Sequence, residues 1–157
     1  MWWRRVRYVL LLTGLCAIAT CPSGKRACTA NTRAQEAEDL LAYLVERIEL
    51  AYAATGKLPT TPAGPTPATS CCEASEDGSC SPDPTLWAAQ GWRDLAFSID
   101  DPYRFQYQYL PDPSGASAVL RATGDLDCDG KPSLYEVKLT IGGGKMTRVW
   151  TRKDPTE

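Results

Sequence analysis

An acidic stretch from Asp125 to Glu136 contains the residues best suited to chemistry. It reads DLDCDGKPSLYE, with aspartates at its first, third and fifth positions, glycine at the sixth and glutamate at the twelfth. This is the calcium-loop pattern D-x-[DN]-x-[DN]-G-x5-E. Calcium takes about six to eight oxygen ligands, and carboxylates at alternate residues can curl around one ion. The stretch therefore predicts Ca²⁺ as cofactor, with these ligands: Asp125, Asp127, Asp129, the backbone carbonyl of Lys131, Ser133 and Glu136.

Two alternatives stand beside this interpretation: an acidic turn that binds no ion, and a catalytic carboxylate cluster. Catalysis is the weaker of the two, because acidic groups that converge without a neutralising partner repel one another, and a metal removes that cost. The preceding residues 118–124, AVLRATG, have the pattern of a strand, whereas an EF-hand loop follows a helix. We therefore expect a solitary calcium loop that joins two strands and adds to the stability of the fold.

Composition excludes several classes of function. The 157-residue chain contains no histidine, which removes Ser-His-Asp, Cys-His and His-containing zinc sites. Its net charge is −2 with both signs interspersed, so it has no basic footprint for nucleic acid. No nucleophile stands beside a base, since Ser133 belongs to the acidic loop and the cysteines look paired. We expect a protein that is not an enzyme and has no catalytic residues.

Residues 1–28 have the features of an export signal or a membrane anchor. Three arginines precede an apolar run over residues 8–20, which is shorter than the roughly 20 residues that span a bilayer comfortably. Cleavage after Ala19, an uncleaved anchor in the inner membrane and lipidation at Cys21 all remain open. We expect an exported protein, periplasmic or on the cell surface, with or without a membrane anchor.

The cysteines indicate an oxidising compartment. There are seven, and Cys16 would leave with a cleaved signal. Cys71 and Cys72 are adjacent and cannot easily pair with each other, so we expect one to bond Cys80 and the other Cys128. A zinc site is the alternative, but the Cys-Cys…Cys spacing lacks the two-residue knuckle, and disulfides are favoured outside the cytosol.

The first element that must position these groups is a long amphipathic helix over residues 29–56. Its apolar residues recur at spacings of three and four: Ala37, Leu41, Leu44, Ile48, Ala51 and Tyr52. Thr32 and Gln35 fit a capping box, and Gly56 offers a C-cap. Residues 57–85, rich in Pro, Ser, Thr and Gly, predict a surface loop pinned by cysteines, with a flexible first part.

Residues 86–151 predict an antiparallel β domain that contains the calcium loop, and residues 152–157 a polar tail. Trp87, Trp92, Leu95 and Phe97 are expected in the core. Alternating apolar residues then predict four strands in two hairpins, within residues 103–110, 116–123, 134–141 and 145–151. The expected fold class is α+β: the helix packed on a roughly four-stranded antiparallel sheet.

This arrangement resembles type IV pilins and type II secretion pseudopilins, and more closely pilin-like proteins of myxobacterial type. Those carry a CC…C loop, a W…W…L-x-F-S segment, an F-x-Y-x-Y strand and a G-D-L-D-x-D-G-x-x-S loop. The matching residues here are Cys71, Cys72, Cys80, Trp87, Trp92, Leu95, Phe97, Ser98, Phe105, Tyr107, Tyr109 and 124–133. The resemblance implies a pilin-like fold and, as partners, other pilin-like or secretion-system subunits.

The resemblance also implies a function: a structural subunit or accessory protein of a type IV pilus or type II secretion system. One feature departs from the family, because nothing before Asn31 matches the pilin maturation site, and Glu36 follows no apolar span. Polymerisation through a pilin N-terminus is therefore not expected. The alternative is a stand-alone periplasmic or surface calcium-binding module, anchored or not by a lipid.

Overall fold

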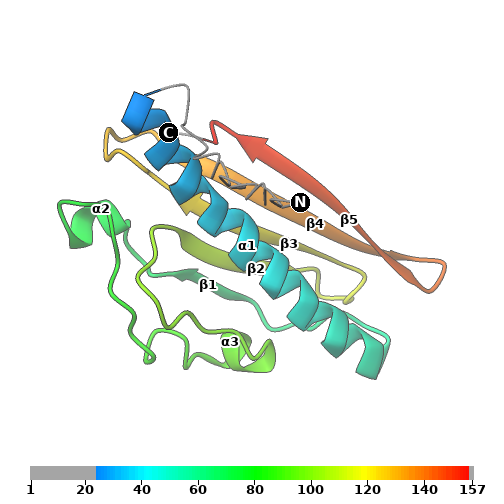
Figure 1. Ribbon diagram of the computed structural model, residues 1–157. Coiled ribbons are helices and arrows are strands. Elements are labelled where there is room, and N and C mark those ends of the chain that lie inside the picture. Colours follow the sequence, from blue (N-terminus) through cyan, green and yellow to red (C-terminus); the bar gives the residue numbers. More distant parts are fainter. Residues whose placement is uncertain (1–23, 156–157) are drawn as a thin grey trace, which may run out of the picture.

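The structure, a computed structural model, describes residues 24–155, with side chains from residue 31 onward. Figure 1 shows one long helix lying across one face of an antiparallel sheet, with two short helices in the segment between them. The elements are α1 (Gly24–Thr55), β1 (Ala63–Thr66), α2 (Cys71–Ala74), α3 (Gln90–Asp94), β2 (Gln106–Pro111), β3 (Ser117–Gly124), β4 (Ser133–Gly142) and β5 (Lys145–Lys153). The predicted export segment, Cys16 and Cys21 lie outside the described residues.

Helix α1 buries the stripe that its sequence predicts. Ala37, Leu41, Leu44 and Ile48 are fully buried against the sheet, and Tyr52 packs on the same core. The C-cap is confirmed, because Gly56 has φ +72° and its N–H donates to the Tyr52 carbonyl at 2.7 Å.

The predicted capping box is wrong. Helix α1 begins at Gly24, so Thr32 and Gln35 lie within it, where capping geometry does not occur. Gln35 instead donates from its side-chain amide to the Asp39 carboxylate one turn later, at 2.9 Å. Ser, Thr, Asn and Asp side chains favour the start of a helix, but tertiary context decides at which of them a helix begins.

The expectation of a four-stranded, pilin-like sheet is contradicted, because the sheet has five antiparallel strands in the order β1-β2-β3-β4-β5. The four predicted strands correspond to β2–β5, and β5 extends to Lys153, into the predicted polar tail. The additional strand, β1, comes from the segment that we expected to be a flexible loop. Proline-rich composition concealed it, since prolines are tolerated in a strand only at an edge, where the missing N–H faces away from the sheet.

Strand β1 is held at that edge from both sides. Ala63 and Thr66 are buried and lie opposite Tyr109 and Tyr107 of β2. The Trp92 indole N–H donates to the Thr66 hydroxyl at 2.8 Å, which ties β1 to α3. The buried partners of β1 are distant in the chain, so local composition could not reveal them.

The core lies between α1 and the helix-facing side of β2, β3 and β4. Tyr107, Leu120 and Val137 represent these strands and are fully buried. The predicted aromatic anchors join this core: Trp87 packs edge-on against Trp92 and Phe97 at centroid distances of 5.3 and 5.6 Å. Side chains on the opposite side of the sheet are half-buried or exposed. No helix within residues 24–155 is both long and apolar enough to cross a bilayer.

Candidate metal centre

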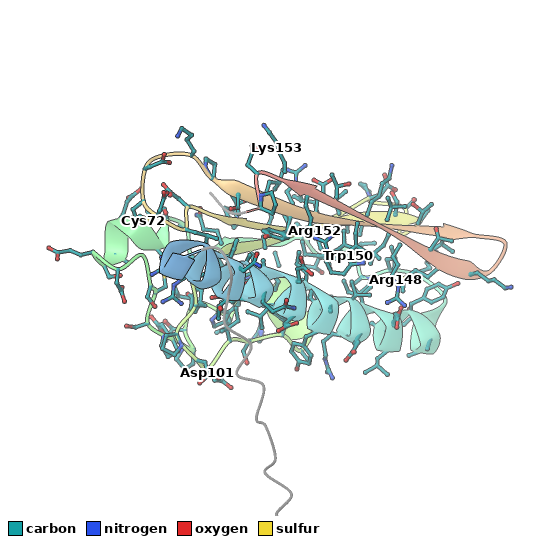
Figure 2. All side chains as sticks on the ribbon, turned by 45° about the horizontal axis from the view of Figure 1, so that its top comes forward. Cys72, Asp101, Arg148, Trp150, Arg152 and Lys153 are labelled. Atoms are coloured by element: carbon teal, nitrogen blue, oxygen red, sulfur yellow. A yellow bond between two sulfur atoms is a disulfide. The ribbon has the colours of Figure 1, made fainter. Side chains whose placement is uncertain are left out.

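The acidic loop connects β3 to β4 and is fixed to the rest of the fold at three points. Cys128 forms a disulfide with Cys72 of α2, which Figure 2 labels at this end of the molecule. The Arg33 guanidinium of α1 donates to the Leu126 carbonyl. The Leu126 side chain is 3% exposed and belongs to the hydrophobic core. Leu126 and Cys128 are thus anchored to the rest of the fold, whereas Asp127 between them is exposed to solvent.

The start of the loop depends on a glycine. A Cβ at Gly124 would lie 2.7 Å from the ring of Phe105, closer than nonbonded carbons approach. Gly124 is also the last residue of β3 and lies opposite Ser133 of β4. The Phe105 ring therefore packs directly on the main chain of Gly124, at the point where the chain leaves β3 and enters the loop.

Three of the predicted ligands converge. Carboxylate oxygens of Asp125, Asp127 and Asp129 lie within 4.8 Å of one another. Two oxygens bound to one calcium at about 2.4 Å can be separated by at most about 4.8 Å, so the spacing is compatible with a shared ion. Asp127 and Asp129 are exposed, and Asp125 is half-buried. Like charges this close repel one another, and a cation between them turns that repulsion into attraction.

Main-chain donors hold the loop in its turn. Asp125 accepts hydrogen bonds from the N–H groups of Asp129, at 3.1 Å, and Gly130, at 2.7 Å. Gly130 has φ +89°, a conformation that glycine adopts without strain, as the sixth position of the motif requires. Cys128, which forms the disulfide with Cys72, also has a positive φ, +61°. The Asp125 carboxylate, at the first position of the motif, therefore holds the main chain of the turn in place.

Lys131 places a positive charge on this cluster. Its ammonium lies 2.6 Å from one Asp129 oxygen, and its N–H donates to the other at 2.9 Å. These two bonds, the ammonium first, lower the pKa of the Asp129 carboxyl below its usual value. Lys131 therefore has two opposed roles with respect to a metal: its backbone carbonyl is a predicted ligand, and its side chain competes for a predicted ligand.

The structure places the other two predicted ligands in β4, on opposite sides of the sheet. Ser133 is fully buried and shares the core-facing side of β4 with Tyr135 and Val137. Glu136 lies on the opposite side of the sheet and forms an ion pair with Arg121 of β3 at 2.8 Å. In a strand each residue advances about 3.3 Å, so position twelve moves away from the loop, whereas in an EF-hand it lies in the first turn of a helix.

The second disulfide joins Cys71 and Cys80, so each of the adjacent cysteines has one of the expected partners. The Cys72–Cys128 bridge packs on Gly78, where a Cβ would lie 3.1 Å from the Cys128 sulfur. The Cys72 sulfur also contacts the Asp125 carbonyl oxygen at 3.1 Å. Since a disulfide sulfur carries no hydrogen, this contact is van der Waals packing, and the bridge lies directly against the first residue of the loop.

Sequence reasoning missed a partly buried carboxylate at the helix–sheet junction. Glu36 of α1 accepts hydrogen bonds from the Arg104 N–H, at 2.8 Å, and the Tyr107 hydroxyl, at 3.2 Å. Burial raises the pKa of the Glu36 carboxyl above its usual value, although these donors act in the opposite direction. Burial also raises the pKa of the Tyr107 phenol well above its usual value, and Glu36 raises it further. No local signal distinguishes Glu36 from the exposed acids of the same helix.

Comparison with known proteins gives no family: no family model, curated protein or solved structure matches this chain.

Proposed function

We propose that this protein is a non-enzymatic structural or accessory component that functions outside the cytosol and that calcium stabilises. The observation that carries the proposal is the convergence of Asp125, Asp127 and Asp129 within 4.8 Å. The two disulfides support the oxidising compartment, since such bonds persist outside the cytosol. Export through residues 1–28 belongs to the same proposal.

Calcium suits this site better than magnesium or a transition metal. The available ligands are carboxylate and carbonyl oxygens, which hard cations prefer, and they lie in an exposed loop. The three aspartates and the Lys131 carbonyl supply part of the shell, and water supplies the rest, so the affinity belongs to the weak extracellular range of around 10⁻⁴–10⁻³ M. Ser133 lies opposite Gly124, the residue before Asp125, whereas Glu136 becomes a ligand only if its ion pair with Arg121 opens.

Binding at this loop stabilises the whole fold through its attachments. The ion would neutralise repulsion between carboxylates that Leu126, Arg33 and the Cys72–Cys128 bridge hold at one corner. A ligand that binds only the native state at about ten times its Kd, which is the millimolar range for this affinity, adds about 1.4 kcal/mol to the free energy of unfolding. Calcium therefore acts here as a reversible clamp on the β3–β4 connection.

Thermal unfolding of the oxidised full chain tests the proposal. We expect millimolar calcium to raise the Tm and a chelator to lower it, and magnesium at the same concentration to have a smaller effect. Asp127→Asn should abolish the calcium shift, whereas Asp101→Asn, at an exposed aspartate outside the cluster, should leave it intact. Equal Tm values with calcium and with chelator would refute calcium binding.

In the same experiment, the variant Glu136→Gln tests whether the Glu136 carboxylate is a ligand of the ion. If Glu136 leaves Arg121 to bind the ion, this variant loses the calcium shift as Asp127→Asn does. If the ion pair persists, the shift is retained and the variant loses only the modest free energy of a partly exposed pair, typically under about 1 kcal/mol.

A role as a subunit or accessory protein of a type IV pilus or type II secretion system is the more specific form of this proposal. The observation that favours it is the length of α1, which continues beyond the sheet-covering stripe toward the N-terminal segment. Co-purification of the full chain with pilus or secretion-system subunits in its own cells tests it. Purification of the chain without such subunits would leave the stand-alone calcium-binding module as the better description.

A further inference from the structure

The two edges of the sheet are unequal. Strand β1 has 4 residues and includes Pro65, and Gly91 of α3 packs against the main chain of Pro62 beside it. Strand β5 has 9 residues, contains no proline and forms the other edge. Figure 1 shows it along the margin of the sheet, and no other part of residues 24–155 pairs with its outer side. A long strand edge of this kind is a template for pairing with another chain.

The hydrogen-bond pattern fixes which main-chain groups of β5 face outward. The Ile141 N–H donates to the Ala116 carbonyl at 2.8 Å, toward β3, so the next residue, Thr140, directs its main chain toward β5. Its register partner there is Thr147. Alternation along the antiparallel ladder then turns four main chains away from β4: those of Met146, Arg148, Trp150 and Arg152. These groups make a ladder of donors and acceptors along the free edge.

All charged residues of β5 itself are basic. Strand β5 contains four basic residues and no acidic one: Lys145, Arg148, Arg152 and Lys153. Figure 2 shows Arg148, Trp150 and Arg152 along the strand, and Asp101 on the far side of α1 in that view. The two arginines pair with glutamates of α1, Arg148 with Glu49 at 3.4 Å and Arg152 with Glu38 at 2.8 Å.

The lysines lie on the other side of the strand. Lys145, Val149 and Lys153 alternate with the residues that face α1, and all three are exposed. Asp154, which directly follows Lys153, is the acidic residue nearest to that lysine in the chain. An added strand would therefore meet two exposed ammonium groups on the open side of the sheet and the half-buried Trp150 on the helix side.

We propose that the β5 edge binds an extended acidic segment of another protein, which adds a strand to the sheet. Main-chain hydrogen bonds along the ladder supply affinity, and carboxylates that meet Lys145 and Lys153 supply selectivity and register. Pairing of two β5 edges is disfavoured, because it would bring the basic strands of two copies directly against each other. This inference rests on the edge and its charge, and does not depend on calcium.

Hydrogen exchange of the full chain with a defined peptide tests the proposal. The probe is a synthetic peptide as long as β5, 9 residues, in which glutamate alternates with threonine. We expect it to slow exchange at the amides of Met146, Arg148, Trp150 and Arg152. Exchange at Thr147 and Val149, whose N–H groups already face β4, should not change. Two peptides serve as controls: one with lysine in place of glutamate, and one with the same charge but prolines in place of two threonines.

Two charge variants sharpen the test. Lys145→Glu combined with Lys153→Glu should weaken binding of the acidic peptide by at least about tenfold, since each substitution reverses a charge at the interface. Lys57→Glu combined with Arg93→Glu changes the net charge equally at exposed positions away from β5 and should leave binding unchanged. Arg148→Pro removes one outward N–H and should weaken binding without preventing folding, because proline is tolerated at an edge.

Three results would overturn the proposal. The first is binding of the proline-containing peptide as tight as that of the probe, which would mean charge attraction without strand pairing. The second is peptide binding that leaves the four outward amides unprotected. The third is protection of the edge by anionic lipid vesicles but not by the acidic peptide, which would make the strip a membrane-binding surface.

Discussion

Lys131 and Asp129 are the pair of residues on which metal affinity depends most directly. A cation that binds Asp129 must compete with an ammonium 2.6 Å from the carboxylate. Lys131→Gln keeps the backbone carbonyl and removes the competing charge. We expect the Kd for calcium, measured by titration calorimetry, to fall about fivefold.

Lys138→Gln is the matched control, since Lys138 is an exposed lysine of β4 outside the loop. Its calcium affinity should equal that of the unmodified protein. Weaker binding in Lys131→Gln would show that the ammonium supports the geometry of the loop more than it opposes the ion.

Glu36 makes stability depend on pH in a predictable direction. Its pKa in the folded protein is raised, chiefly by burial, so the folded state binds a proton at Glu36 more tightly than the unfolded state does. The stability that this proton contributes is fully present below the unfolded pKa and is lost as the pH rises through the folded pKa. From pH 7 down to about 4.5, the unmodified protein should gain free energy of unfolding relative to Glu36→Gln.

Denaturant unfolding of both proteins across this pH range measures that difference. Subtracting one curve from the other removes the contribution of carboxyls whose pKa is lowered, such as those of Asp112 and Asp129, because both proteins contain them. A difference that is flat or falls toward low pH would show that the donors from Arg104 and Tyr107 outweigh burial at this site.

The β3–β4 loop is the element that the Cys72–Cys128 disulfide most constrains, because the two residues are 56 positions apart in the chain. Removing a bridge that closes a segment of this size costs about 2–4 kcal/mol. We expect Cys72→Ala combined with Cys128→Ala to lower the free energy of unfolding by that amount. Amides of residues 125–132 should then exchange faster through local opening, and amides in the centre of β3 and β4, which exchange through global unfolding, should exchange faster in proportion to the lost free energy of unfolding.

The hairpin turn at Gly143 and Gly144 is the internal control for that experiment, since it lies outside the bridge and its exchange should not change. Unchanged exchange in the acidic loop would mean that Leu126 and the Arg33 bond position the aspartates without the disulfide. Calcium affinity of the variant would then equal that of the unmodified protein.

The molecule as a whole is held together by the contact of α1 with one side of the sheet. Leu44 is fully buried in this contact, whereas Leu50 of the same helix is 62% exposed. Leu44→Ala should lower the free energy of unfolding by about 2–5 kcal/mol, because it leaves a cavity between layers. Leu50→Ala should change it by no more than about 0.5 kcal/mol. Thermal or denaturant unfolding of the two variants checks both values.

A similar loss in Leu50→Ala would indicate that the exposed side of α1 is covered in the state that unfolds, for example by a second molecule. Dependence of that loss on protein concentration would confirm such association.

The features that depend on short-range spacing could be predicted from the sequence. The stripe from Ala37 to Ile48, the alternation that defines β2–β5, the C-cap at Gly56 and the aspartates at alternate positions are all periodic, and periodicity follows directly from helix and strand geometry. The inability of Cys71 and Cys72 to bond each other predicted that one bonds Cys80 and the other Cys128, and the fold decides which bonds which.

Tertiary structure decided everything that depends on which distant residues meet. It made β1 a strand, because residues 63–66 pair with Tyr107 and Tyr109 of β2, and it placed Glu36 beside Arg104. It also separated Glu136 from the aspartates, because β4 continues as an extended chain where the motif implies a helix. Spacing along the chain determines which side chains of one helix or strand lie on the same side of it. Only the packing of α1 on the sheet determines which residues of different elements share a site.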